Sequence, residues 1–179
     1  MARKKTALNA RSTSGKTEQT GTKLLEHNQF PIVGVGASAG GLEAFTQLFK
    51  HLPAKPGMAF VLIQHLAPAH ESMLTELLSK AASMPVREVK DGMIVAADNV
   101  YIIPPDKEML IFQGVLHLMP RDEVKGQYMP VDSFLRSLAQ DRRNNAIAVI
   151  LSGSGSDGSM GIKAVKGEGG LVFAQDVTA

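Results

Sequence analysis

The sequence contains no cysteine, and no run of apolar residues approaches the about 18 residues that a membrane-spanning helix needs. The absence of cysteine excludes disulfide bonds, metal sites built on thiolates and catalysis by a cysteine nucleophile. The N-terminus is basic but lacks the apolar core of a signal peptide. We therefore expect a cytoplasmic protein that inserts no segment into a membrane.

Excess positive charge is also absent from most of the chain, although the net charge is +2. Residues 1–28 carry six Lys or Arg and two Glu, whereas residues 29–179 carry 13 basic and 15 acidic residues. The first segment is rich in Ser, Thr, Lys and Asn, with little to bury, and is predicted to be a disordered basic leader. The body has no nucleic-acid signature, so no nucleic-acid partner is expected.

Three almost wholly apolar segments are each followed by a helical pattern. Continuous apolar strands are typical of parallel sheets, and strands that alternate with helices are typical of α/β domains. The strands are predicted at 32–36, 58–64 and 146–151, and the helices at 41–51, 71–82, 131–142 and 160–168. In the second helix, the spacing predicts that Met73, Leu74, Leu77 and Leu78 face inward.

Short strand-like runs separated by turn signals occupy the middle of the chain. The last two runs flank Gln113-Gly114 and are predicted to form a hairpin. The predicted runs are 86–89, 100–103, 109–112 and 115–119. We therefore predict a doubly wound, mostly parallel sheet with helices on both faces and a small antiparallel hairpin insertion.

Ser38, His65 and Asp157 each follow a predicted buried strand. Right-handed crossovers place the carboxyl ends of such strands at one edge of the sheet, where ligands bind in open α/β folds. A serine hydroxyl becomes an effective nucleophile when an imidazole accepts its proton and a carboxylate orients that imidazole. The three residues predict a triad in the chain order Ser–His–Asp, which differs from the Ser–Asp–His order of α/β-hydrolases.

The segment around Ser38 fits two motifs. Residues 36–40, Gly-Ala-Ser-Ala-Gly, match the G-x-S-x-G turn that presents a nucleophilic serine between a strand and a helix. Residues 34–39 also match the G-x-G-x-x-A fingerprint of dinucleotide-binding folds. That fingerprint requires an acidic residue at the end of the second strand, where this sequence has Gln64 and His65. The interpretation of Ser38 as the nucleophile of an esterase is therefore favoured over nucleotide binding.

Simpler roles for the same residues remain open at this point. One alternative is that Asp157 has no catalytic role and simply caps the following helix. Another is that the glycine-rich segment 152–158 binds a phosphate through its backbone N–H groups. His65 and His70 are separated by Pro68, which disfavours a metal site on one helical face. We expect neither a metal nor a cofactor.

Five segments carry a recognisable combination of motifs: 32–41 (IVGVGASAGG), 63–66 (IQHL), 101–105 (YIIPP), 131–138 (VDSFLRSL) and 151–158 (LSGSGSDG). Through them the chain, from about residue 31 to its last residue, resembles the catalytic domain of the chemotaxis protein-glutamate methylesterases, the CheB family. The resemblance implies a doubly wound α/β domain without a cofactor. It also implies hydrolysis of glutamyl methyl esters on chemoreceptors with release of methanol, and some members also deamidate glutamine.

The resemblance places the catalytic serine, histidine and aspartate of the family on Ser38, His65 and Asp157. Backbone N–H groups near Ala39 and Ser154 are the expected oxyanion donors. Two positions depart from the family pattern, which often has threonine at the position of Ala39 and commonly has methionine at the position of Ser154.

The expected organisation is a leader, residues 1–28, followed by a methylesterase catalytic domain, residues 29–179, that is truncated at its C-terminal end. The chain resembles the N-terminal part of fusions in which a methylesterase precedes a receptor methyltransferase. The expected partners are methylated chemoreceptor cytoplasmic domains and a methyltransferase domain in the same longer chain. The alternative is a non-catalytic domain of a signalling fusion that docks on receptors or regulates its neighbour.

Overall fold

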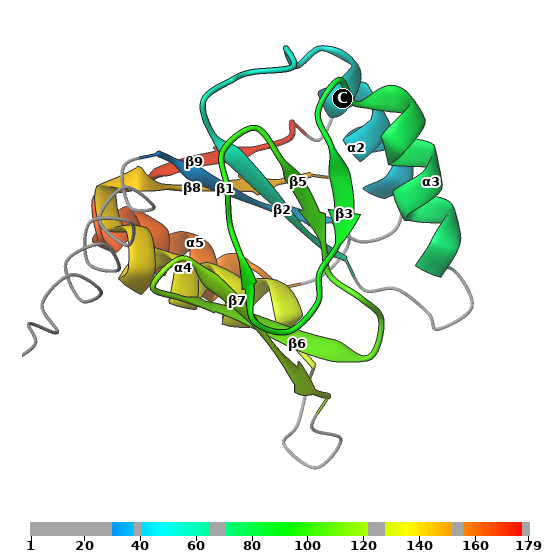
Figure 1. Ribbon diagram of the computed structural model, residues 1–179. Coiled ribbons are helices and arrows are strands. Elements are labelled where there is room, and N and C mark those ends of the chain that lie inside the picture. The colour runs from blue at the N-terminus through cyan, green and yellow to red at the C-terminus, as the bar shows by residue number, and fades with distance from the viewer. Residues whose placement is uncertain (1–29, 38–40, 65–70, 122–127, 152–155, 177–179) are drawn as a thin grey trace, which may run out of the picture.

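The computed structural model describes residues 30–37, 41–64, 71–121, 128–151 and 156–176. In this part of the chain, six strands form one parallel sheet in the order β3-β5-β2-β1-β8-β9 (Figure 1). The strands are β1 (Ile32–Ala37), β2 (Ala59–Gln64), β3 (Val86–Glu88), β5 (Val100–Ile102), β8 (Ala146–Ile150) and β9 (Leu171–Ala174). The predicted doubly wound, mostly parallel sheet is confirmed.

Helices cover both faces of this sheet (Figure 1). On one face, α2 (Gly41–Lys50) and α3 (Glu71–Ala81) bury Phe45, Phe49 and Leu78 against the odd-numbered side chains of β1. On the other face, α4 (Pro130–Arg142) and α5 (Ser159–Gly167) form a second apolar core. Burying one such side chain contributes about 1.5–3 kcal/mol, so the two cores hold the helices firmly on the sheet.

Two glycines let α4 approach β1 closely. A Cβ atom added to Gly34 would lie 2.6 Å from Leu135 Cδ2, and one added to Gly36 would lie 2.5 Å from Val131 Cγ1. Both glycines lie inside the strand, and neither has a positive φ. The absence of a side chain at these two positions is therefore required by the packing of α4 on the strand.

A second, antiparallel sheet has the order β4-β7-β6 and packs against α4. Its strands are β4 (Met93–Ile94), β6 (Lys107–Phe112) and β7 (Val115–Pro120). Gln113 and Gly114, with φ of 49° and 75°, form the predicted hairpin turn between β6 and β7. The sequence did not assign the runs 86–89 and 100–103 to either sheet, and in the structure both contribute parallel strands, β3 and β5.

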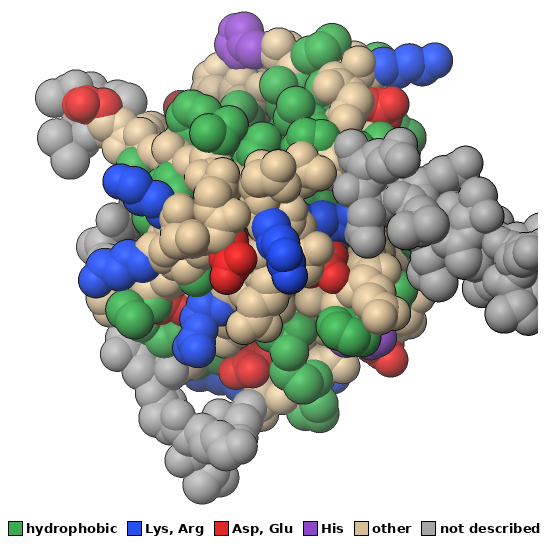
Figure 2. Space-filling view, turned by 90° about the vertical axis from the view of Figure 1, so that its left-hand side faces the viewer, with side chains coloured by type: hydrophobic (Ala, Val, Ile, Leu, Met, Phe, Trp, Pro, Cys, Tyr) green, Lys and Arg blue, Asp and Glu red, His purple; other side chains and the backbone are tan. Residues whose placement is uncertain are grey.

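The surface is polar over most of the face seen in Figure 2, where Lys and Arg side chains are interspersed with Asp and Glu. Hydrophobic side chains gather in the upper part of the same view. The edge strand β9 leaves Leu171 and Phe173 each 55% exposed. Among the described helices, none has both the length and the apolar character that crossing a bilayer requires.

Candidate active site

The carboxyl ends of three neighbouring strands meet at one edge of the parallel sheet. β1 lies between β2 and β8, with Ala37 paired with Gln64 and Gly36 paired with Ile150. The chain crosses from β1 to β2 over the face of α2, and it reaches β8 and β9 over the face of α4 and α5. This reversal beside β1 is a topological switch point, the place where open α/β sheets bind ligands.

Four of the five predicted site residues lie outside the described residues: Ser38, Ala39, His65 and Ser154. Ser38 directly follows Ala37, the last residue of β1, and His65 directly follows Gln64, the last residue of β2. The strand ends that lead into them are therefore adjacent and in register. Asp157 is described, and it lies between β8 and α5.

The carboxylate of Asp157 lies at the N-terminus of α4. Its Oδ2 accepts a hydrogen bond from the backbone N–H of Val131 at 3.1 Å, and its Oδ1 accepts one from that of Asp132 at 2.9 Å. Both N–H groups belong to the first turn of α4, where they have no partner within the helix and where the helix dipole favours a negative charge. Asp157 therefore does cap a helix, but it caps α4 and not the helix that follows it in sequence.

Asp132 makes the reciprocal contact with α5. Its Oδ1 accepts a hydrogen bond from the backbone N–H of Gly161 at 2.7 Å, and Asp132 is only 7% exposed. The two helices are in close contact here, since a Cβ atom on Gly161 would lie 2.5 Å from Leu135 Cβ. The loop before α5 thus caps α4, while the first turn of α4 caps α5, and this pair of contacts fixes Asp157 relative to the sheet.

Gly158, the residue after Asp157, forms the turn by which the chain enters α5. Gly158 has a φ of +96°, a left-handed conformation that side chains rarely tolerate, and an added Cβ would lie 2.9 Å from Ile150 Cδ1. Glycine is required here for both reasons. The turn at Gly158 leads from Asp157, which is bonded to the first turn of α4, directly into α5.

The first turn of α2 packs tightly on the ends of β1 and β2. A Cβ atom on Gly41 would lie 2.9 Å from Ala37 Cβ and 3.0 Å from Gln64 Nε2. The half-buried Gln64 side chain thus lies beside the start of α2. These contacts hold the start of α2 and the ends of the two strands, which precede Ser38 and His65 in the chain, as one unit.

Tyr128 lies two residues before α4 and donates a hydrogen bond from its hydroxyl to the Lys107 carbonyl at 2.8 Å. Burial raises the pKa of Tyr128, the guanidinium of Arg121 opposes the shift, and the carboxylates of Glu108, Asp106 and Asp157 add to it. The guanidinium of Arg121 is 4.4 Å from the centre of the Tyr128 ring. The Tyr128 phenol is therefore held in its neutral form, with the Arg121 cation stacked on its ring.

No group of three or more His, Asp or Glu side chains in the described part of the chain could hold a metal ion.

The arrangement of these strands and helices corresponds to a known family. A family model described as CheB methylesterase matches residues 33–179. This chain belongs to the CheB methylesterase family. The crystal structure of the Thermotoga maritima CheB methylesterase catalytic domain superposes with a TM-score of 0.75 at 31% identity, covering 83% of this chain and 81% of that one.

Curated members of the CheB methylesterase family give the same result. A protein-glutamate methylesterase/protein-glutamine glutaminase 2 of Burkholderia pseudomallei is 34% identical over 147 residues, which is 82% of this chain and 43% of that protein. A protein-glutamate methylesterase/protein-glutamine glutaminase 1 of Pseudomonas syringae pv. tomato is 31% identical over 159 residues, which is 88% of this chain and 40% of that protein. The chain therefore spans less than half the length of these relatives.

Reasoning from the sequence missed the backbone donors that hold Asp157. They are the N–H groups of Val131 and Asp132 in the first turn of α4. One signal pointed to them, because Pro130 occupies the start of the helix and marks where unpaired N–H groups begin. No local pattern indicated that the acceptor would be the carboxylate of Asp157, 25 residues beyond Asp132.

Proposed function

We propose that this chain is a serine esterase that hydrolyses glutamyl methyl esters on chemoreceptors and releases methanol. The observation that carries the proposal is the register of the sheet, in which the strands preceding Ser38 and His65 end side by side. The strand that leads toward Asp157 lies on the other side of β1. Membership of the CheB methylesterase family supports the same reaction.

In the proposed mechanism, the Ser38 hydroxyl attacks the ester carbonyl while His65 accepts its proton. The tetrahedral intermediate carries an oxyanion, for which backbone N–H groups near Ala39 and Ser154 are the proposed donors. The bond to the methoxy group then breaks, and His65 returns the proton so that methanol leaves. Water attacks the acyl-enzyme with His65 as the base, which regenerates Ser38 and a glutamate carboxylate.

Asp157 is the proposed orienting carboxylate. Each of its oxygens accepts one backbone hydrogen bond, and a carboxylate oxygen has two lone pairs. These two bonds are compatible with a further N–H donor, for which we propose the ring of His65. A carboxylate fixed by two backbone groups holds its position through the reaction, as the orientation of an imidazole requires.

The same residues suit deamidation of glutamine. An amide carbonyl is attacked in the same way, and the leaving group is ammonia in place of methanol. The curated relatives carry both activities in their names. We propose deamidation as a second activity of the same site.

The cellular setting also belongs to this proposal. We propose a cytoplasmic location, methylated chemoreceptor domains as substrates, and a methyltransferase domain in the same longer chain. The leader at residues 1–28 and the catalytic domain at 29–179 are the proposed organisation, and the matched region begins at residue 33.

A serine-reactive fluorophosphonate probe tests the catalytic assignment against the docking alternative. We expect the chain to be labelled, and we expect labelling to be lost in Ser38→Ala and strongly reduced in His65→Ala. Circular dichroism establishes that both variants remain folded. Receptor binding without any labelling would instead support a non-catalytic docking domain.

A further inference from the structure

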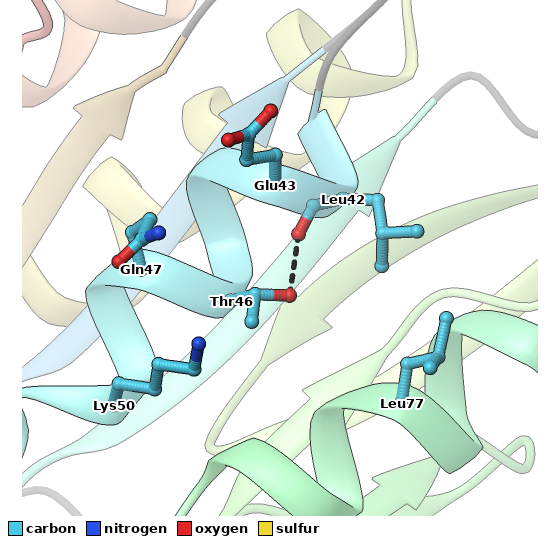
Figure 3. A pocket seen from close by; sticks show the side chains of 6 residues that line it. All are labelled: Leu42, Glu43, Thr46, Gln47, Lys50 and Leu77. Carbon is cyan, nitrogen blue, oxygen red and sulfur yellow. Dashed lines mark hydrogen bonds between the residues drawn. The ribbon is translucent and has the colours of Figure 1, made fainter.

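A groove of about 500 Å³ runs between α2 and α3 (Figure 3). Its walls are formed by Leu42, Glu43, Thr46, Gln47 and Lys50 of α2 and by Leu77 of α3. The helical spacing of α3 predicts that Leu77 faces the core, but this side chain is 38% exposed and lines the groove, while Leu74 and Leu78 are buried. Leu42 and Leu77 thus present apolar surface from opposite helices.

One end of the groove lies at the candidate active site. Leu42 and Glu43 are in the first turn of α2, which begins at the carboxyl edge of the sheet directly against Ala37 and Gln64. Lys50 ends the same helix. The wall from Glu43 to Lys50 is about 10 Å long at about 1.5 Å per residue, which matches about two turns of a second helix.

The walls determine what kind of chain can occupy the groove. Both are helices, so their backbone N–H and C=O groups are largely bonded within each helix, and the Thr46 hydroxyl donates to the Leu42 carbonyl at 2.7 Å (Figure 3). An extended peptide would find few backbone partners here, whereas a helix brings its own hydrogen bonds satisfied. The occupant that fits is a helix with an apolar stripe.

The charged residues at the two ends of the groove favour one orientation of a bound helix. Glu43 lies at the end next to the candidate site, and Lys50 lies at the far end. A bound helix with a basic side chain near Glu43 and an acidic one near Lys50 has complementary charge. Such pairs at the rim chiefly affect the encounter rate and the choice of orientation, and salt weakens them.

We propose that the groove binds an amphipathic helical segment of the protein substrate and thereby presents a glutamyl ester at the edge where β1 and β2 end. The inference rests on the proposed function for the identity of the substrate. It goes beyond that function by assigning substrate docking to α2 and α3. The groove is therefore expected to make no contribution to the binding of a small ester that lacks such a segment.

The test compares two substrates of the full 179-residue chain: a methylated chemoreceptor cytoplasmic domain and N-acetyl-glutamate γ-methyl ester amide. The variant Leu77→Lys places a charge in the apolar wall that α3 contributes to the groove. We expect kcat/KM for the receptor to fall at least about tenfold, mainly through KM, and kcat/KM for the small ester to stay within about twofold. The matched control is Phe112→Lys on the antiparallel sheet, where the wild-type side chain is 65% exposed, and it should leave both substrates unaffected.

A second variant leaves the apolar side chains Leu42 and Leu77 unchanged. Lys50→Glu should raise the KM for the receptor at low ionic strength, and the effect should shrink as salt is added. Unchanged receptor kinetics in both groove variants would overturn the proposal, and so would an equal loss on both substrates. A wild-type dimer that Leu77→Lys dissociates would also overturn it, because a second copy would then occupy the groove.

Failure of the proposed function is separable from failure of the docking site. If the wild-type chain hydrolyses neither substrate, receptor binding is measured directly by fluorescence anisotropy. Weaker binding by Leu77→Lys than by wild type and Phe112→Lys then supports the groove without the reaction. Equal binding by all three proteins overturns it.

Discussion

The paired contacts of Asp157 and Asp132 allow the structural and catalytic roles of a carboxylate to be separated. Each residue uses its side chain to cap a neighbouring helix, Asp157 on α4 and Asp132 on α5. Only Asp157 is predicted to belong to the triad. The variants Asp157→Ala and Asp132→Ala therefore remove similar structural contacts, and they differ in whether they remove the residue that is proposed to orient His65.

The expected loss of stability follows from the contacts. Loss of a capping side chain costs about 0.5–2 kcal/mol, and leaving a buried N–H without a partner costs about 1–3 kcal/mol. Asp157 is partly buried, so water can replace part of its contact, whereas the hydrogen bond between Asp132 and the Gly161 N–H is buried. We expect Asp132→Ala to be at least as destabilising as Asp157→Ala, with decreases in Tm of about 3–10 °C.

The expected loss of activity has the opposite order. Removal of the carboxylate that orients a catalytic histidine lowers turnover on the order of 10⁴-fold. We expect a loss of this size for Asp157→Ala, and a loss below about tenfold for Asp132→Ala at 25 °C, where both variants remain folded. Urea unfolding and hydrolysis of the small glutamyl ester measure the two quantities. Equal losses of activity in the two variants would refute the catalytic role and leave Asp157 as a cap only.

Two further predictions follow from the packing and from the buried tyrosine. Gly36→Ala should destabilise by about 1–3 kcal/mol in urea unfolding and lower esterase activity, because its methyl group meets the stiff Val131 beside the donors of Asp157. Gly34→Ala meets the end of the flexible Leu135 side chain and should cost less and spare activity. Burial raises the pKa of Tyr101, whose oxygen accepts a hydrogen bond from Ala96 N–H. The folded state therefore binds the proton more tightly than the unfolded state, so stability should fall as the pH rises above about 10, and less steeply in Tyr101→Phe.

The sequence was sufficient to predict the central strands β1, β2 and β8 and the edge at which the candidate site lies. Buried parallel strands have a strong local signature, and the residue that follows each strand is then fixed by chain order. Once β1, β2 and β8 are parallel neighbours, their carboxyl ends must share an edge. This is why Ser38, His65 and Asp157 could be nominated together without any knowledge of their contacts.

Contacts between distant segments were beyond the reach of local patterns. Three features illustrate this: the close approach of α4 to Gly36, the cap from Asp157 to α4, and the outward position of Leu77. Each depends on how two segments far apart in the sequence are placed. Leu77 is apolar and has the spacing of a buried residue, but α2 does not cover it fully. The two-residue strand β4 was missed for another reason, because so short a segment has no periodicity to detect.

The most direct test of the account is methanol release from a methylated chemoreceptor domain by this chain and by its Ser38→Ala variant. We predict release by the wild type and none above background by the variant, with identical circular dichroism spectra for both. Equal release by the two proteins would contradict the central claim that the serine after β1 is the nucleophile of a methylesterase.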